Sequence, residues 1–387
     1  MRRPSWTVTF ISAGAALLAA LVGAALYSAR QQVHAYYERV LEPERLLAPV
    51  GAAPPTSFRL TDVPWVSSDL ELASSISLVM LAAQFGKDEP RQKIDFLMGT
   101  TWGATPIPRQ IGFVPGQDPE LGFRSAAAAL GLRRRYFVTD DAERYIRELK
   151  AQLSGGRAVR VAVNLVALEK RKQEEPIAHS IVLVGYDEAS FEYYEPLCRH
   201  PSPCEPGTRP PGLAGQRVPT AQLLDAVDQQ SIVYKYPWRY QLLVLEKAGE
   251  PVVNLEEVLL RNARALVGFK LDDFAAGADE VEDTSKAVSR AGREGFTKPL
   301  ERAVRLAMLA RRDDARMLAV LFPGDPRAEI AATHLERSAE AFAKALSMFE
   351  QKSNVLGLTD ALTAASNADR AAGQALLLAV PDGGLPR

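Results

Sequence analysis

The sequence predicts an α+β fold: a mixed domain followed by an all-α domain, behind an N-terminal transmembrane helix. Three observations support this prediction. Residues 4–29 carry no charged side chain; helix patterns precede strand patterns between residues 58 and 247; and strand patterns vanish after residue 255, where helical periodicity continues. A chain of 387 residues is long enough for two or three domains.

The uncharged run over residues 4–29 follows Arg2 and Arg3. About 20 apolar residues suffice to span a bilayer as a helix, and Trp6 and Tyr27 stand where aromatic rings favour the membrane interface. The alternative is a cleaved signal peptide, whose apolar region is usually about 7–15 residues long. We therefore expect an uncleaved signal-anchor over residues 1–30. The two arginines favour a cytoplasmic N-terminus and a periplasmic or extracellular soluble part.

Residues 31–57 are expected to form a polar stalk and a linker, because Pro54 and Pro55 are adjacent and break helices. Cys198 and Cys204 lie in a proline-rich segment and are either paired or two free thiols. The net charge of −1 argues against nucleic acid as a partner. With four histidines, and without a phosphate or dinucleotide motif, the sequence predicts neither a metal nor a cofactor.

Residues 58–247 are expected to form the mixed domain. Residues 97–122 are rich in Gly, Pro and Thr and are predicted to be mostly loop. The apolar periodicities predict helices over residues 73–85, 124–132 and 142–153, then strands over residues 158–164, 180–185, 190–194, 231–236 and 240–245.

Residues 248–387 are expected to form the helical domain, with helices over residues 298–321, 327–351 and about 358–378. The connection from Pro323 to Pro326 is short, which predicts that the first two helices are antiparallel. Their apolar stripes are interpreted as core, with a groove for a partner helix as the alternative.

One pair of residues suggests chemistry. His179 begins a predicted buried strand, and Glu195 ends the next strand of the same hairpin, so their side chains can approach each other. A carboxylate beside an imidazole fixes its tautomer and orients it as a base. The alternative is a structural histidine with a satisfied hydrogen bond.

Two short motifs resemble those of the papain-like peptidases of the bacteriocin-processing, double-glycine leader type. In that family Cys-Gly-Pro-Ala-Ser-Leu-x-Met-Leu begins a helix, and Ser77-Leu-Val-Met-Leu81 is similar to its end. His179-Ser-Ile-Val-Leu-Val-Gly-Tyr-Asp187 resembles the family's histidine strand, and Glu195-Pro196 falls where the family has Asp-Pro or Asn-Pro. The resemblance implies a papain-like domain over residues 58–247.

The sequence departs from this family at the residues that carry catalysis. The resemblance places Ala73 at the nucleophile position, with Ser74 and Ser75 in place of Gly-Pro. No glutamine occurs between Phe58 and Ala83 to supply the oxyanion donor. Cysteine catalysis requires a thiolate, which an alanine cannot provide.

Three functions follow as alternatives. The first is a membrane-anchored, catalytically inactive peptidase-like protein that binds an extended peptide or a protein partner. The second is an acyl hydrolase or acyltransferase that uses Ser74, His179 and Glu195. The third is a purely structural envelope protein. For Ser74 and Ser75, capping of the helix is the alternative to a catalytic role.

Overall fold

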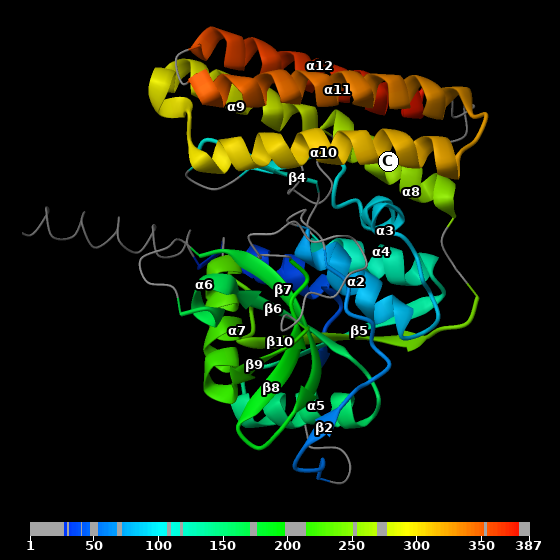
Figure 1. Cartoon of the computed structure of the whole chain (residues 1–387), viewed down its shortest axis with the longest axis vertical. Coiled ribbons are helices and arrows are strands. Elements are labelled where there is room, and N and C mark those ends of the chain that lie inside the picture. The colour runs from blue at the N-terminus through cyan, green and yellow to red at the C-terminus, as the bar shows by residue number, and fades with distance from the viewer. Residues whose placement is uncertain are drawn as a thin grey trace, which may run out of the picture.

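The protein consists of a sheet domain and a helical bundle, with α3 and β4 between them (Figure 1). The computed structural model describes residues 27–28, 31–39, 41–46, 53–67, 72–106, 110–116, 119–170, 176–197, 214–250, 254–268, 277–351 and 354–378. Mixed α/β organisation with a C-terminal helical region, as predicted, is therefore present in the described chain.

The main sheet has the strand order β1-β5-β10-β6-β7-β8-β9, and β2 pairs with β7 outside this path. Every pairing is antiparallel except that of β1 with β5. The strands are β1 (Glu44–Arg45), β2 (Phe58–Arg59), β5 (Leu132–Thr139), β6 (Val159–Asn164), β7 (Ala178–Tyr186), β8 (Ser190–Tyr194), β9 (Ala214–Pro219) and β10 (Tyr240–Lys247).

The helices of the sheet domain pack against this sheet around one large hydrophobic core, which continues into the bundle through Leu259, Leu318 and Leu335. They are α2 (Ala73–Ala83), α3 (Arg91–Met98), α4 (Pro119–Ala129), α5 (Ala142–Ser154), α6 (Leu165–Leu168) and α7 (Thr220–Tyr234). The predictions for α2, α5, β6, β8 and β10 are confirmed to within a few residues.

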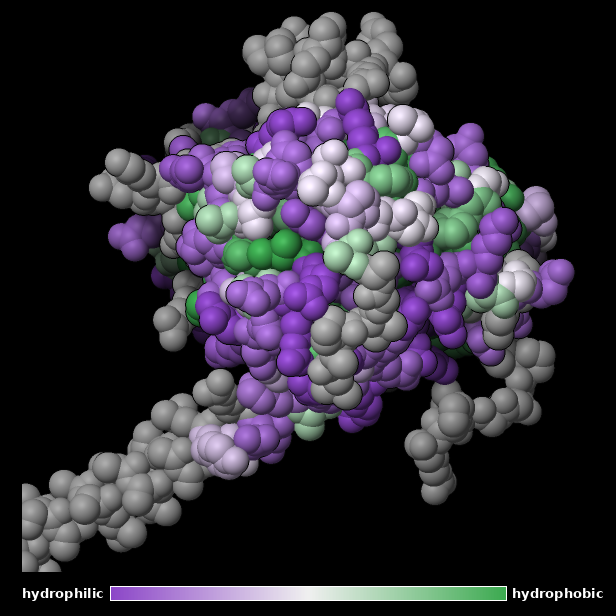
Figure 2. All heavy atoms as spheres, turned by 90° about the horizontal axis from the view of Figure 1, so that it is seen from below, coloured by the Kyte–Doolittle hydropathy of each residue, from purple (hydrophilic) through white to green (hydrophobic). Residues whose placement is uncertain are grey.

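Seen from the end opposite the bundle, the surface is mostly hydrophilic with a small apolar patch (Figure 2).

The predicted helix over residues 124–132 is wrong at its C-terminal end, where β5 begins. Arg133 and Arg135 lie on this strand and pair with Glu246 of the neighbouring β10. Opposite charges across antiparallel strands stabilise the pairing. Three consecutive arginines conceal the strand in the sequence, although the residues after them, Tyr136 to Val138, are buried.

The predicted strand over residues 231–236 is also wrong, because these residues form the end of α7 and the turn after it. The helix ends at Lys235, which adopts a left-handed conformation with φ of 57°. Ile232 and Val233 are exposed, so their β-branched side chains do not serve a sheet core. Helix context therefore overrides their strand propensity.

The bundle comprises α8 (Leu255–Val267), α9 (Gly277–Ala291), α10 (Lys298–Leu321), α11 (Pro326–Gln351) and α12 (Val355–Leu377). The predicted antiparallel pair of α10 and α11 is confirmed (Figure 1). Thr297 caps α10 by accepting a hydrogen bond from the Leu300 N–H. A second core, which includes Val304, Phe342 and Leu362, lies within this bundle.

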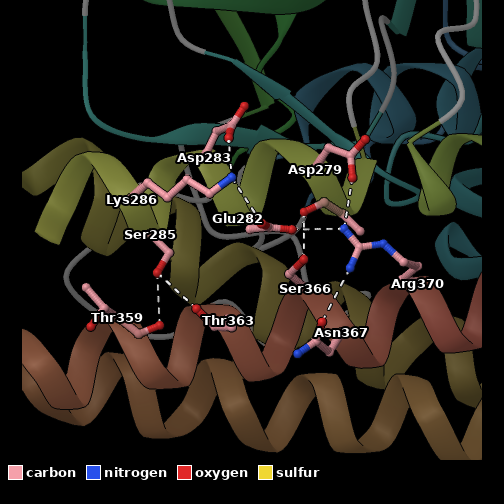
Figure 3. A network of polar contacts seen from close by, with 11 residues as sticks. Asp279, Glu282, Asp283, Ser285, Lys286, Thr359, Thr363, Ser366, Asn367 and Arg370 are labelled. Carbon is pink, nitrogen blue, oxygen red and sulfur yellow. Dashed lines mark hydrogen bonds and ion pairs between the residues drawn. The ribbon is translucent and has the colours of Figure 1, made fainter.

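Polar contacts fasten α9 to α12 at the edge of the bundle (Figure 3). Arg370 of α12 pairs with Asp279 and Glu282 of α9. The Ser285 hydroxyl donates a hydrogen bond to the Thr359 carbonyl, at 3.0 Å. These contacts add polar links to the packing of the two helices.

Residues 97–122, predicted to be mostly loop, contain a small hairpin between the two parts of the molecule. Its strands are β3 (Ala104–Pro106) and β4 (Phe113–Pro115). Phe113 is buried in the bundle core, so the hairpin inserts an aromatic side chain into the helical domain. Gly116 follows β4 at the base of the hairpin with φ of +103°, and a Cβ there would lie 1.9 Å from the Thr100 carbonyl oxygen, which explains the requirement for glycine.

Buried ions join the hairpin to the bundle. Arg311 of α10 is fully buried and forms a bidentate pair with Asp369 of α12, with both N···O distances at 2.8 Å. The same guanidinium donates to the carbonyl oxygens of Thr101 and Gly103. A guanidinium matches a carboxylate bidentately and keeps donors for two carbonyl groups.

Part of the predicted stalk packs against the sheet domain instead of standing free. Tyr36, Tyr37 and Leu41 are buried in its core, and Tyr37 contacts the Tyr236 ring edge-to-face. No helix in the described ranges is long and apolar enough to cross a membrane. The predicted anchor over residues 4–29, apart from residues 27–28, lies outside the described residues, as do Cys198 and Cys204.

Candidate functional site

A cavity of about 530 Å³ lies where the N-terminus of α2, the start of β7 and the first turns of α10 meet. On one wall it is lined by Ala73 and Ser74 of α2 and by His179 of β7. Residues predicted from two distant sequence motifs therefore face one shared space. The size falls within the range of pockets that bind small molecules or a few residues of a peptide.

His179 and Glu195 form the pair that the sequence predicts. The His179 Nε2 lies 2.8 Å from Glu195 Oε1, and both side chains are buried. The same carboxylate oxygen accepts the Leu197 N–H at 3.0 Å, and Trp65 Nε1 donates to the Glu195 carbonyl, also at 3.0 Å. A proton on Nε2 leaves Nδ1 as the accepting nitrogen of the neutral ring.

The N-terminus of α2 is anchored by two of its three serines. Ser75 Oγ lies 3.0 Å from Thr100 Oγ1, and Ser77 Oγ lies 2.9 Å from Ser180 Oγ of β7. Because Ser180 directly follows His179, the second bond fixes the helix beside the histidine strand. The alternative of a serine cap is wrong for this helix, whose N-cap is Leu72 without a side-chain hydrogen bond.

Ala73 and Ser74 are the residues of α2 nearest to its N-terminus that face the cavity. Ala73 is buried and Ser74 is half-buried. The N–H groups of a first helical turn lack intrahelical acceptors and carry the positive end of the helix dipole. In a catalytic site this position would stabilise an anionic nucleophile, but here Ala73 presents a methyl group.

The rest of the histidine motif has a structural role. A Cβ on Gly185 would lie 2.8 Å from the Phe58 carbonyl oxygen, so glycine permits β2 to pair with β7. Asp187 Oδ1 accepts the N–H groups of Ala189 and Ser190, at 2.9 and 2.8 Å, and closes the β7–β8 turn. These hydrogen bonds lower the pKa of Asp187.

The opposite wall of the cavity was not predicted from the sequence. It consists of β4, including the half-exposed Val114, and of α10, which presents Lys298, Arg302 and Leu306. The signal available in the sequence was the spacing of Lys298 and Arg302, which places them one turn apart on a helix. That this face of α10 meets the sheet domain depends on the packing between the two parts.

A buried ion pair forms the floor between α4 and β6. Arg160 Nη1 lies 2.5 Å from Glu120 Oε1, and its Nε donates to Ser180 Oγ at 2.8 Å. Both residues line the cavity. The pair connects α4 to the strand next to His179 and was also not predicted.

The described residues contain no group of three or more His, Cys, Asp or Glu side chains arranged to hold a metal ion. Glu195 pairs with His179, and Glu120 pairs with Arg160. What the arrangement provides chemically is a base with its orienting carboxylate, facing a helix N-terminus.

The sequence matches no protein-family model and no curated protein. Function is therefore inferred from the geometry of the cavity.

Proposed function

We propose that this protein is a membrane-anchored, catalytically inactive relative of the papain-like peptidases that binds an extended peptide or a protein partner in the cavity. The observation that supports this most strongly is the shared lining of the cavity by Ala73, Ser74 and His179, with His179 bonded to Glu195. An oriented base opposite a helix tip is the arrangement of a nucleophilic site.

The absence of a nucleophilic side chain at position 73 favours a binding role over a catalytic one. Ala73 carries no group that can attack a carbonyl, and no glutamine stands upstream of α2 from Phe58 onward to stabilise an oxyanion. Removing a single oxyanion donor typically reduces the rate about 10²–10³-fold. A cavity that keeps its shape while losing both groups is suited to hold a peptide without cleaving it.

The test of peptide binding uses the chain without residues 1–30, the expected membrane anchor. A library of blocked, extended peptides is screened by fluorescence anisotropy against the wild-type protein and against the Ala73→Trp variant, which fills the cavity at the helix tip. Binding that disappears in Ala73→Trp supports the proposal. Binding that persists in the variant places the peptide elsewhere and contradicts it.

A second function is favoured by one observation: Ser74 also lines the cavity, next to Ala73. In this alternative Ser74, His179 and Glu195 form an acyl hydrolase or acyltransferase. A fluorophosphonate probe would then label the wild-type protein and would fail to label Ser74→Ala and His179→Ala. Absence of labelling in the wild-type protein would contradict this alternative.

The third alternative, a purely structural envelope protein, predicts that tryptophan fills the cleft. Among the described residues, neither Trp65 nor Trp102 lines the cavity. Trp102 is buried in the core of the sheet domain, and Trp65 is bonded to the Glu195 carbonyl. The presence of an open cavity therefore favours a binding role.

A further inference from the structure

The buried stripe of α7 ends in a glutamine. Leu223, Ala226 and Val227 of this helix are buried in the core of the sheet domain. Gln230 takes the next position of the same helical stripe and is only 4% exposed. Burial of a carboxamide is favourable only where its polar atoms find hydrogen-bond partners, so a glutamine at this position calls for one.

Gln230 lines the cavity, and its carboxamide makes no hydrogen bond with any of the described residues. The adjacent Ser231, which is also buried, donates to the Arg239 carbonyl at 2.8 Å. The other buried polar side chains that line the cavity have partners within the described part of the chain, in the pairs Ser75–Thr100, Thr100–Asp95, Arg160–Glu120 and His179–Glu195. Gln230 is therefore the exception among them, and an unbonded buried group of this kind requires an explanation.

An extended peptide in the cavity needs partners for its main-chain N–H and C=O groups, because a buried peptide group without a hydrogen bond is unfavourable. Apolar residues, among them Ile177, Leu197 and Leu306, supply much of the cavity lining. A carboxamide offers both an N–H donor and a C=O acceptor. The Gln230 side chain therefore complements a peptide unit, which also carries one donor and one acceptor.

We propose that Gln230 binds the main chain of the extended peptide, accepting a hydrogen bond from a peptide N–H and donating one to a peptide C=O. This inference rests on the proposed peptide-binding function and deepens it. Recognition through Gln230 is directed at the backbone and does not depend on the side chains of the peptide.

The test uses the full-length protein in detergent and the peptide that binds most tightly in the anisotropy screen, with an acetylated N-terminus and an amidated C-terminus. Gln230→Met keeps the shape of the side chain and removes its hydrogen-bonding groups. We expect this variant to bind the peptide about 3–10-fold more weakly in isothermal titration calorimetry, the factor that a neutral hydrogen bond contributes. The melting temperature of the free protein should be unchanged or higher, because the variant removes an unbonded buried amide.

The matched control is Gln229→Met, on the same helix. Gln229 bonds to Asp225 and to Asn164 and does not line the cavity. This variant should bind the peptide as tightly as the wild-type protein does.

An ester scan of the peptide identifies the group that Gln230 recognises. Each ester replaces one main-chain amide and removes a single N–H donor. At one position the ester should weaken binding to the wild-type protein about 3–10-fold and should have no effect on binding to Gln230→Met.

Three results would overturn the inference. Unchanged affinity in Gln230→Met would show that the carboxamide holds water only, and esters that cost the same in both proteins would show that it does not contact the main chain. A lowered melting temperature of Gln230→Met would assign the carboxamide to the stability of the fold. In each case the peptide still binds the wild-type protein, so the proposed function stands. If no blocked peptide binds the wild-type protein, the proposed function fails and this inference fails with it.

Discussion

At the scale of single residues, the molecule holds the His179 imidazole in a fixed orientation through the Glu195 carboxylate. Glu195 makes two hydrogen bonds through one oxygen, to His179 Nε2 and to the Leu197 N–H. In an inactive protein these bonds remain useful, because they satisfy two buried groups. The pair is thus expected to contribute to stability whether or not it takes part in catalysis.

Replacement of Glu195 by Ala should lower the free energy of unfolding by about 1–3 kcal/mol, since a buried ring N–H and a backbone N–H lose their acceptor. Glu195→Gln keeps a carbonyl oxygen and should lose less. Urea unfolding followed by circular dichroism measures both changes. An equal loss of unfolding free energy in the two variants would contradict a stabilising role for the side-chain oxygen that accepts these hydrogen bonds.

Asp314 gives the protein a pH-dependent element at the junction of the two parts. Its carboxylate accepts the Thr101 hydroxyl at 2.6 Å, and burial raises its pKa to about 7 despite the nearby Arg311. An unfolded aspartate titrates near 3.9. Between about pH 4 and pH 7 the folded state keeps a proton that the unfolded state releases, so this group lowers stability as pH rises and has no further effect above that range.

The Asp314→Asn variant should therefore gain stability relative to the wild-type protein as pH rises from about 4 to about 7, by roughly 1–4 kcal/mol in total. Asn keeps an oxygen to accept the Thr101 hydroxyl. Denaturation midpoints at several pH values give the trend. A difference between variant and wild type that stays constant over this pH range would contradict the account.

At the scale of elements, the β3–β4 hairpin is one connection between the sheet domain and the bundle, beside the hydrophobic core that the two parts share. Arg311 holds it from the bundle side through two carbonyl groups, and Phe113 inserts into the bundle core. The position of α10 relative to α2 and β7, and so the width of the cavity, depends on this hairpin.

Arg311→Ala should cost about 3–5 kcal/mol, because it leaves the buried Asp369 carboxylate without its ion partner. Arg316→Ala is the matched control: it is on the same helix, its side chain is 77% exposed, and its pair with Asp313 spans 3.8 Å. Such an exposed pair contributes about 0–1 kcal/mol. Similar losses for both variants in urea unfolding would argue against a special role for the buried pair.

Sequence reasoning succeeded where local pattern decides structure and failed where distant packing does. The amphipathic helices α5, α10 and α11 follow from periodicity, and the approach of His179 to Glu195 follows from hairpin topology. β5 was missed because Arg133 and Arg135 are paired with Glu44 and Glu246 of neighbouring strands. The cavity wall formed by β4 and α10 was missed because it exists only when α10 packs beside the sheet domain.

The apolar stripe of α10 contains a signal for the buried ion network. Arg311 and Asp314 interrupt the apolar stripe that runs along α10 through Val304, Ala307 and Leu318. Charged residues are rarely buried unless they are paired. Their place in the stripe therefore predicts a buried ion network, although it does not identify Asp369 as the partner.

At the scale of the whole molecule, the sequence predicts that residues 4–29 attach the two domains to a membrane. The packing of Tyr36 and Tyr37 against the sheet domain would then hold that domain close to the bilayer. Full-length protein should remain in the membrane pellet after a high-pH carbonate wash, and deletion of residues 1–30 should release it. A full-length protein that is washed off would contradict the anchor.

The most direct measurement is the reactivity of a thiol placed at the helix tip. In a background of Cys198→Ser and Cys204→Ser, the Ala73→Cys variant is alkylated with iodoacetamide over a range of pH, with and without His179→Ala. We predict a thiol pKa well below the ordinary value of about 8.5, which returns toward that value when His179 is removed. An ordinary pKa that does not respond to His179 would show that the imidazole does not face position 73, and the proposed relationship to papain-like peptidases would fail.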